Sequence, residues 1–362
     1  MRRRTLVALI AAALVAASCV ALEPGGNPYY DPAKPHHTST GFRNNYTQIE
    51  GGGFWKWQWQ RWTGPRAAPP PGGWAIPVTA AHVAFLAANR EATTVTWIGH
   101  ATLLVQVAGR NLLTDPQFSD RASPVTFAGP ARLQPPAIAI DALPRIHAVL
   151  ISHNHYDHLD LPSLERLARQ PGGPPAFFVP LGLKAWFRRQ GLPDPVELDW
   201  WDARDAGGVE VHAVPVQHWS ARTPLDRNRT LWCGYVVRAP GFSLAFLGDT
   251  GYSPDFAEIG RRFPGLDLAL IPIGAYEPRW FMHRQHVDPA EAVAIHRDLG
   301  ARASIGVHWG TFPLSDEPMD EPPRALARAV RASGLPAASV TTMAIGETRT
   351  LPTRSRDAGP VS

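Results

Sequence analysis

The chain has 362 residues, 44% of them hydrophobic, with a formal net charge of +4 and a pI of about 9.3. These values exclude a disordered chain and allow one large domain or two small ones. Only three lysines are present, and the arginines are mixed with acids. The chain therefore lacks the basic stripe that nucleic-acid binding requires, and we expect no nucleic-acid partner.

The first 18 residues are predicted to be an export signal. MRRR is a positively charged start, and the apolar run TLVALIAAALVAA is short for a membrane span of about 20 residues. Small residues then precede Cys19, as at a bacterial lipoprotein processing site. We expect a cell-envelope lipoprotein, periplasmic or at the outer membrane, with Cys19 acylated; plain secretion is the alternative. The other cysteine is Cys233, so no intrachain disulfide is expected.

Residues 19–50 are rich in Pro, Gly, Asn and Tyr, which predicts a tether or an extended arm. The stretch FWKWQWQRW then places Trp55, Trp57 and Trp59 two residues apart. This spacing favours an edge strand that packs tryptophans on the domain, and a belt at lipid headgroups is the alternative. We expect one folded domain over residues 51–352 and a disordered tail over 353–362.

From Thr93 onward, strand and helix patterns alternate along the chain. Strands are predicted at 93–99, 102–109, 111–116, 147–152, 176–180, 209–217, 231–237, 242–249, 266–274 and 303–310. Helices are predicted at 161–170, 254–263, 288–300 and 321–334. Meandering strands followed by alternating strands and helices indicate a layered α/β fold of mixed sheets with helices outside.

The stretch HNHYDH places three histidines and an aspartate directly after the predicted buried strand HAVLIS. Residues two apart in an extended segment project the same way, so one turn can offer ligands to two neighbouring ions. Imidazole and carboxylate groups bind zinc readily, and crowding them without a partner is costly. The sequence therefore predicts metal binding by His153, His155, Asp157 and His158.

Three further polar residues each follow the end of a predicted strand. They are His218 in VPVQHWS, Asp249 in FLGDTGY and His308 in IGVHWGTF. Alone, each is typical of a cap or turn. In a layered α/β fold, however, strand ends meet at one rim, so these residues can complete a set of seven ligands. Other histidines, such as His36, His82 and His147, are taken as structural.

The order HxHxDH, His, Asp, His resembles the metallo-β-lactamase superfold, which implies an αββα sandwich of two mixed β-sheets flanked by helices. From about Thr93 to Glu347 the chain also resembles the N-acylphosphatidylethanolamine-hydrolysing phospholipase D family. That likeness is carried by WIGHATLLV, LTDPQFSDRASP, VLISHNHYDHLD, FVPLGL, ELDWW, GDTGY, IPIGAYEPRWFM, QHVDPAEA and HWGTF. HxHxDH alone would indicate only the superfold.

The resemblance implies two zinc ions per chain. One would be held by His153, His155 and His218, the other by Asp157, His158 and His308, and Asp249 would bridge them. Asp157 and Asp249 are thus the predicted catalytic carboxylates. A hydroxide shared by two zinc ions would have a pKa lowered towards ~7 and would attack phosphorus, while the metals neutralise phosphate charge.

Further residues carry over by motif. Asp115 of LTDP would orient the HxHxDH turn, and His100 of IGHAT is expected near the metals. His286 of QHVDP would lie near the substrate, although it also neighbours a helix start at Asp288. Tyr252 or a zinc-bound water would protonate the leaving group.

The implied reaction releases N-acylethanolamine and phosphatidic acid from a phospholipid at a membrane surface, and the resemblance also implies a homodimer. Thr126 and Phe127 stand where the animal enzymes have a Gln-Tyr pair near the substrate, which weakens recognition of the N-acyl amide. The alternatives are another hydrolase of the superfold (general phosphodiesterase, lactonase or thioesterase) and a non-catalytic envelope protein that binds metal or lipid. A di-iron redox site is disfavoured, because no carboxylate replaces the second histidine of HxH.

Overall fold

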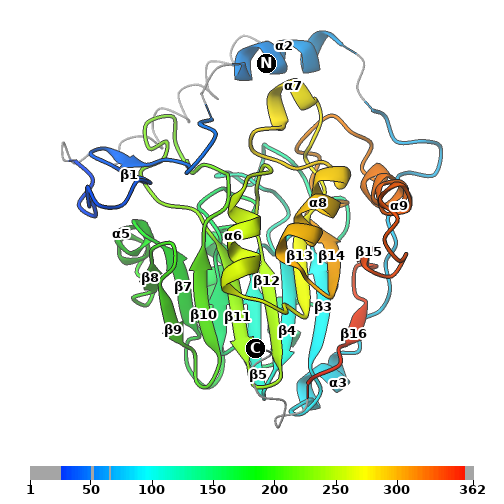
Figure 1. Cartoon of the computed structure of the whole chain (residues 1–362). Helices are drawn as coiled ribbons and strands as arrows, with labels where there is room; N and C mark the ends of the chain where they lie inside the picture. The colour runs from blue at the N-terminus through cyan, green and yellow to red at the C-terminus, as the bar shows by residue number, and fades with distance from the viewer. Residues whose placement is uncertain (1–25, 50–52, 65–66, 355–362) are drawn as a thin grey trace.

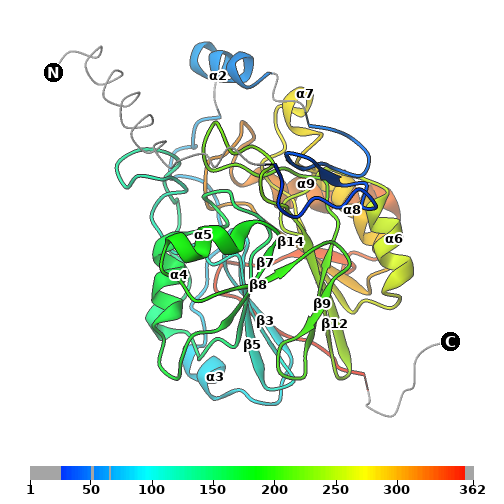
Figure 2. The same cartoon turned by 90° about the vertical axis from the view of Figure 1, so that its left-hand side faces the viewer.

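The computed structural model describes residues 26–49, 53–64 and 67–354. In this part of the chain, two seven-stranded sheets face each other. Figure 2 shows the layers: α4 and α5 lie outside one sheet, and α6 and α8 lie outside the other. This is the predicted sandwich of two mixed sheets flanked by helices, and the predicted fold class is confirmed.

The strands have the following bounds. The first sheet contains, in spatial order, β16 (Thr348–Thr350), β3 (Thr94–Gly99), β4 (Thr102–Val107), β5 (Arg110–Thr114), β6 (Ala148–Leu150), β7 (Ala176–Pro180) and β8 (Val196–Leu198). The second contains β15 (Val340–Thr342), β14 (Ala303–Val307), β13 (Leu268–Pro272), β12 (Phe242–Phe246), β11 (Gly234–Ala239), β10 (Glu210–Val214) and β9 (Ala203–Asp205). A small ladder pairs β1 (His37–Thr38) with β2 (Gly41–Phe42).

The helices are α2 (Phe54–Thr63), α3 (Val83–Ala88), α4 (Leu161–Ala168), α5 (Leu183–Arg189), α6 (Asp255–Arg262), α7 (Arg279–Met282), α8 (Pro289–Leu299), α9 (Glu321–Ser333) and the 3-10 turn η1 (Ile140–Ala142). All strands and helices predicted from Thr93 onward are present. Helix α4 begins directly after the histidine-rich turn, because the Asp160 side chain caps it by accepting from the Ser163 N–H.

Both sheets have an antiparallel half and a parallel half. In the first, β3, β4 and β5 pair antiparallel, while β5 to β8 pair parallel. In the second, β9 to β12 pair antiparallel, and β12 to β15 pair parallel. It follows that β10, β12 and β14 run in the same direction and end at the same edge.

Alternating burial explains why the sheets stack. Successive strand residues point to opposite faces. In β4, Leu103 and Val105 join the core between the sheets, whereas Leu104 faces the cluster under α4 and α5. In α4, Leu164 and Leu167 cover that second cluster. Apolar residues on both faces of a strand therefore require a layer on each side.

The tryptophan stretch is a helix, so the expected edge strand is wrong. Helix α2 buries Trp57 and exposes Trp55, Trp59 and Trp62. The Trp57 ring stacks on Phe281 of α7 with 5.1 Å between ring centroids, and its Nε1 donates to the Asp316 carboxylate (2.9 Å). Positions 55, 59 and 62 share one face of the helix. The alternation of Trp with Lys and Gln is compatible with the strand period of about 2 residues and did not exclude the helical period of about 3.6 residues.

The segment expected to be a tether or extended arm lies against the domain where it is described, at residues 26–49 (Figure 1). His36, His37, Phe42 and Asn44 are buried there. The predicted signal and Cys19 lie outside the described residues. Of the predicted tail, Arg354 donates to the Asp267 carboxylate (2.8 Å).

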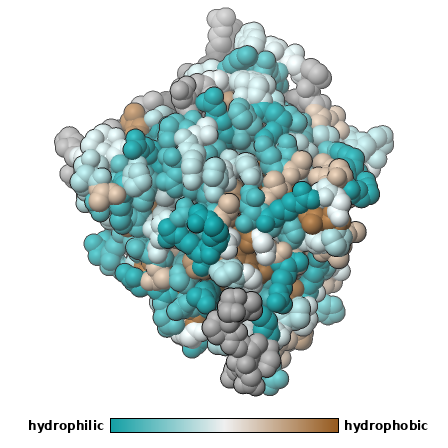
Figure 3. All heavy atoms as spheres, in the orientation of Figure 1, coloured by the Kyte–Doolittle hydropathy of each residue, from teal (hydrophilic) through white to brown (hydrophobic). Residues whose placement is uncertain are grey.

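Across residues 26–49, 53–64 and 67–354, every helix is too short or too polar to cross a membrane. The face of the molecule shown in Figure 3 is largely hydrophilic, with small apolar patches.

Candidate metal centre

The seven predicted ligands come together at one edge of the sandwich. The histidine-rich turn follows β6, His218 follows β10, Asp249 follows β12 and His308 follows β14. Because β10, β12 and β14 run the same way, their carboxyl ends bring these three side chains to one rim. Five of the seven residues are at most 3% exposed, Asp157 is 9% exposed, and His155 is partly buried.

The first group contains three ring nitrogens that converge. His153 Nε2 lies 2.8 Å from His155 Nδ1, and His218 Nε2 lies 3.2 Å from the same atom. All three ligand atoms lie within the range that one ion could bridge. This is the set predicted to hold the first zinc ion.

The second group contains the Asp157 carboxylate and the rings of His158 and His308. The two Nε2 atoms lie 3.2 Å apart, and Asp157 Oδ2 lies 3.3 Å from His158 and 3.4 Å from His308. His100 joins this group, since its Nε2 lies 3.0 Å from Asp157 Oδ2. His100 therefore lies beside this group.

Asp249 lies between the two groups. Its Oδ1 is 3.0 Å from His308 Nε2, and its Oδ2 is 3.2 Å from His158 Nε2 and 3.9 Å from His218 Nε2. One carboxylate therefore faces ligands of both predicted ions, which is the geometry expected of a bridging group.

The Asp115 side chain is hydrogen-bonded to both ends of the histidine-rich segment. Its Oδ1 accepts from the Ser152 N–H (2.7 Å), and its Oδ2 accepts from Ser152 Oγ (2.6 Å) and His158 Nδ1 (2.6 Å). Burial raises the pKa of the Asp115 carboxyl, and the His158 ring and Ser152 donors act against that rise. These contacts fix the direction of the His158 ring.

The carboxylates make the site favourable for positive charge. Burial lowers the pKa of His153 well below its usual range. Burial would do the same to His158 and His308, but Asp249 and Asp157 outweigh it, so the His158 pKa lies well above its usual range and the His308 pKa is raised to about 9. The two carboxylates therefore favour positive charge at His158 and His308.

The donor set fits a metal for a second reason. Three rings have Nδ1 beside a hydrogen-bond partner. His153 and His218 have low pKa values and stay neutral, so a proton on Nδ1 leaves the Nε2 lone pair facing another acceptor nitrogen, Nδ1 of His155. A bound cation resolves that repulsion. His155 Nε2 is also buried among the described residues without a hydrogen-bond partner. The Nδ1 contacts are His153 to Ser152 Oγ (2.9 Å), His158 to Asp115 Oδ2 (2.6 Å) and His218 to the Gln285 carbonyl oxygen (3.0 Å).

His286 lies at the edge of the centre. Its Nδ1 is 3.8 Å from Asp249 Oδ2 and is buried without a hydrogen-bond partner among the described residues. Burial lowers the pKa of His286 to about 4. Arg279 holds the main chain here, donating to the His286 carbonyl oxygen (2.8 Å). A neutral ring with an unused nitrogen therefore faces the carboxylate of Asp249, the predicted bridging ligand.

Tyr252, Thr126 and Phe127 are the remaining predicted substrate residues. Tyr252 is 40% exposed, and its hydroxyl donates to Asp298 of α8 (2.6 Å), an interaction that raises the phenol pKa to about 12. This placement does not support Tyr252 as the leaving-group acid. Thr126 lines a pocket that also contains Tyr156 of the histidine-rich turn, and Phe127 is 70% exposed.

Sequence reasoning missed Arg222 and Arg279. Arg222 Nη1 donates to the carbonyl oxygens of Asn154 (2.8 Å) and Leu159 (2.9 Å), and its guanidinium lies 3.9 Å from the Tyr156 ring centre. Arg222 therefore holds the main chain at both ends of the histidine-rich turn and packs on the ring of Tyr156 within it. The order Trp-Ser-Ala-Arg after His218 gave no signal for this role, because the contact crosses the fold.

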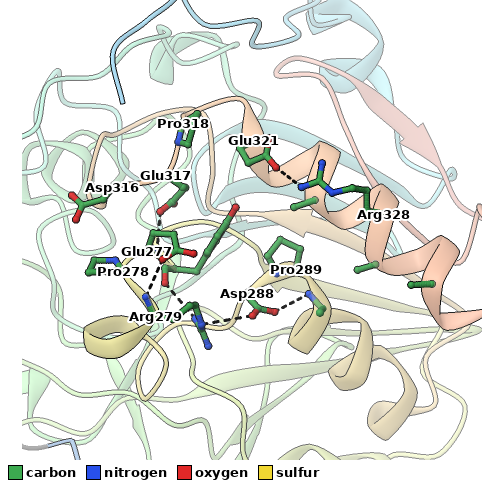
Figure 4. Close-up of a pocket in the computed structure, with 15 residues that line it drawn as sticks. Glu277, Pro278, Arg279, Asp288, Pro289, Asp316, Glu317, Pro318, Glu321 and Arg328 are labelled. Carbon is green, nitrogen blue, oxygen red and sulfur yellow. Dashed lines mark hydrogen bonds and ion pairs between the residues drawn. The ribbon is translucent and has the colours of Figure 1, made fainter. Parts of the chain in front are cut away.

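A second pocket is drawn in Figure 4, between α7, α8 and α9. Its lining includes Glu277, Glu317 and Glu321, together with Arg279 and Arg328. In Figure 4, Arg328 pairs with Glu321 and Arg279 pairs with Asp288, while Glu317 accepts from main-chain N–H groups. None of the predicted metal ligands lines this pocket.

Comparisons with known proteins agree with this geometry. A model of the beta-lactamase superfamily domain matches residues 110–309, a range that contains all seven predicted ligands. N-acyl-phosphatidylethanolamine-hydrolyzing phospholipase D 1 of Caenorhabditis elegans is 42% identical over 229 residues, which cover 60% of this chain and 64% of that protein. A UPF0173 metal-dependent hydrolase of Nitratidesulfovibrio vulgaris is 30% identical over 226 residues, or 62% of this chain and 83% of that protein.

Among solved structures, Igni18, a metallo hydrolase from the archaeon Ignicoccus hospitalis, matches with a TM-score of 0.55 and 22% identity. The match covers 73% of this chain and 100% of that one, and it shows the shared fold. The chain thus spans just under two thirds, 64%, of the worm relative's length. With its sandwich fold, its His/Asp clusters and the family match across residues 110–309, the chain belongs to the beta-lactamase superfamily and is a metal-dependent hydrolase of the metallo-β-lactamase fold.

Proposed function

We propose that the chain is a binuclear zinc phosphodiesterase of phospholipase D type, which hydrolyses N-acylphosphatidylethanolamine to N-acylethanolamine and phosphatidic acid. The observation that carries the proposal is the pair of ligand groups sharing Asp249. The substrate is taken from the name of the worm relative. A lone pair of converging histidines would serve one ion, whereas this set has donors for two.

Two bound zinc ions would supply an activated water and neutralise charge on a phosphodiester. They would be held by His153, His155 and His218 and by Asp157, His158 and His308, with Asp249 shared. The chain's own residues orient this set. His100 bonds Asp157, and Asp115 directs His158, so neither ligand is free to rotate away.

His286 is the side chain best placed to contact a substrate phosphate. Its low pKa keeps the ring neutral near pH 7, so it carries one N–H and one acceptor nitrogen. Its buried Nδ1 faces the Asp249 carboxylate at 3.8 Å. A neutral N–H at this position can donate to a phosphoryl oxygen without adding a positive charge that would repel the metal ions. The leaving-group acid is not Tyr252 in this proposal, because Asp298 already engages its hydroxyl.

The partner we propose is a phospholipid surface, which the exposed tryptophans of α2 would contact. Trp55, Trp59 and Trp62 are 82%, 61% and 75% exposed, and Trp280 of α7 is 43% exposed beside them. Indole rings favour the headgroup region of a bilayer. This face is at the same end of the molecule as α7 (Figure 1). Envelope anchoring through Cys19 and a homodimer remain part of the proposal.

Product analysis tests the activity. Zinc-loaded protein is incubated with mixed vesicles of N-acylphosphatidylethanolamine, phosphatidylethanolamine and phosphatidylcholine, and the products are identified by mass spectrometry. We expect N-acylethanolamine and phosphatidic acid, with Asp249→Asn inactive and Asp141→Asn, an exposed control, active. Intact lipids beside cleavage of a generic phosphodiester would instead support the alternative of a general phosphodiesterase.

Vesicle sedimentation tests the lipid surface. Replacing Trp55, Trp59 and Trp62 together by serine removes the exposed aromatic face, and we expect the bound fraction to fall. Trp186→Ser is the control, because that ring contacts Arg222 in the domain. Equal sedimentation of the triple variant and the wild type would exclude α2 as the contact.

A further inference from the structure

The metal ligand His218 lies in an irregular segment. Strand β10 ends at Val214, and Gln217 makes only an isolated bridge with Gly251 before His218 follows. His218 is fully buried, so its main-chain N–H and C=O need partners inside the protein. Ring orientation at this position depends on what supplies those partners.

Asn44 supplies both. Its Oδ1 accepts from the His218 N–H (3.1 Å), and its Nδ2 donates to the His218 carbonyl oxygen (2.9 Å). Trp232 Nε1, which can only donate, also lies 3.1 Å from Asn44 Oδ1 and therefore fixes which way the amide faces. One buried side chain thus makes the pair of bonds that a neighbouring strand would make.

Both the ring and the main chain of His218 are therefore hydrogen-bonded. The Gln285 carbonyl oxygen lies 3.0 Å from Nδ1 of the ring, and Asn44 holds the main chain on either side of the Cα atom. With Nδ1 donating to Gln285, Nε2 is left for a metal. Asn44 is 174 positions earlier in the chain and lies in the arm, residues 26–49.

The arm is anchored independently of Asn44. Its main chain is tied to the domain by the Phe42 N–H, which donates to the Asn228 carbonyl oxygen (2.9 Å). A second anchor, here called the Asp199 latch, joins the arm to ELDWW. The latch contacts are Lys34 Nζ to Asp199 Oδ2 (2.5 Å), His36 Nε2 to Oδ1 (2.7 Å) and His37 Nε2 to Oδ2 (3.0 Å).

The Asp199 latch is a hydrogen-bonded anchor rather than another metal site. Lys34 already supplies positive charge to Oδ2, and the Trp200 N–H donates to Oδ1 (2.8 Å) beside His36. The contacts of His36 and His37 with the carboxylate have ordinary hydrogen-bond lengths. The Asp199 oxygens are thereby satisfied, and the latch holds the arm that carries Asn44.

We propose that the arm is part of the metal centre and that Asn44 is a positioning residue for His218. The inference rests on the proposed metal centre but not on the identity of the substrate. Without Asn44, two buried main-chain groups of His218 lose their partners, and the segment shifts to find others. The group formed by His153, His155 and His218 then loses its alignment, while the group of Asp157, His158 and His308 keeps its own supports.

Zinc affinity of the full chain tests the proposal. Asn44→Ala removes both bonds, and Asn44→Asp keeps the volume but places an oxygen against the His218 carbonyl oxygen. We expect either change to weaken one of two zinc sites by roughly 10- to 100-fold, as for other residues that support a metal ligand. Competition with a chromophoric chelator measures both sites. Asn45→Ala is the matched control, because Asn45 bonds Asp255 and not His218.

Thermal unfolding with and without zinc separates positioning from general stability. A 10- to 100-fold loss of affinity lowers the zinc-dependent stabilisation by about 1.4–2.7 kcal/mol. Variants that are less stable without zinc but bind two ions with wild-type affinity would overturn the proposal. Should Asn44→Ala not fold, Asn44→Asp decides the matter by the same measurement. A wild-type chain that binds no zinc would instead overturn the proposed metal centre itself.

Discussion

Replacing Asp115 by asparagine should separate orientation of the histidine-rich turn from its ligand chemistry. Asp115 is fully buried and touches no predicted substrate position; it receives three hydrogen bonds, two from Ser152 and one from His158 Nδ1. Asparagine has nearly the same shape but only one acceptor oxygen. If that oxygen serves the Ser152 N–H, an NH2 group faces His158.

The expected losses in stability and in zinc affinity follow from these contacts. A hydrogen bond to a charged group contributes about 1.5–3 kcal/mol, so loss of the His158 contact should lower the free energy of unfolding by about that much. Facing a donor, His158 Nδ1 becomes the acceptor and its proton moves to Nε2. That atom faces Asp249 (3.2 Å) and is the one a metal needs. Zinc affinity should therefore fall by roughly 10- to 100-fold.

Chelator competition and urea unfolding measure the two effects. Asp141→Asn is the matched control, because Asp141 is an exposed partner of Arg166. We expect the control to match the wild type in both assays. An Asp115→Asn protein that binds two zinc ions with wild-type affinity would refute the reasoning that Asp115 sets the His158 tautomer.

Three further predictions concern metal, turn and latch. Zinc at 100 times its dissociation constant should stabilise the fold by about 2.7 kcal/mol, and calorimetry that shows the same melting temperature with and without chelator would count against a metal centre. Arg222→Lys loses stacking on Tyr156 and the fixed planar direction of the Nη1 group that donates to two carbonyl oxygens. This change should cost about 1–3 kcal/mol in urea unfolding, whereas Arg166→Lys should cost little. Burial raises the Asp199 pKa, but His36 and Lys34 hold it well below its usual range. Its stabilisation is therefore present above pH ~3.9 and lost as the pH falls further, so the stability gap between wild type and Asp199→Asn should shrink on acidification.

Local patterns in the sequence were sufficient for ten of the strands and for helices α4, α6, α8 and α9, but not for the short strands β8, β9, β15 and β16 or for helices α3, α5 and α7. Strand residues of the sandwich are apolar in runs, and helices such as α8 carry their own start signal in Asp288 and Glu291. HNHYDH is dense enough in ligands to predict a metal by itself. His218, Asp249 and His308 could be added because each follows a strand, and the common direction of those strands brings them together.

The tryptophan stretch fits both the strand period and the helix period, and only its packing in the folded chain favours the helix. Trp55, Trp57 and Trp59 alternate like a strand, yet stacking of Trp57 on Phe281 and its bond to Asp316 favour the helix. Those contacts join segments more than 200 positions apart, which no short window of sequence records.

The sequence by itself determined the chemistry: which side chains can bind a metal, in what order, and on which strand ends. The tertiary structure decided which residues fix the orientation of these predicted ligands. Asn44 against His218, and Arg222 beneath the histidine-rich turn, are ordinary polar residues in sequence. They gain their roles because buried main-chain groups must be paired, and the partner that reaches them is set by the path of the chain and not by its local pattern.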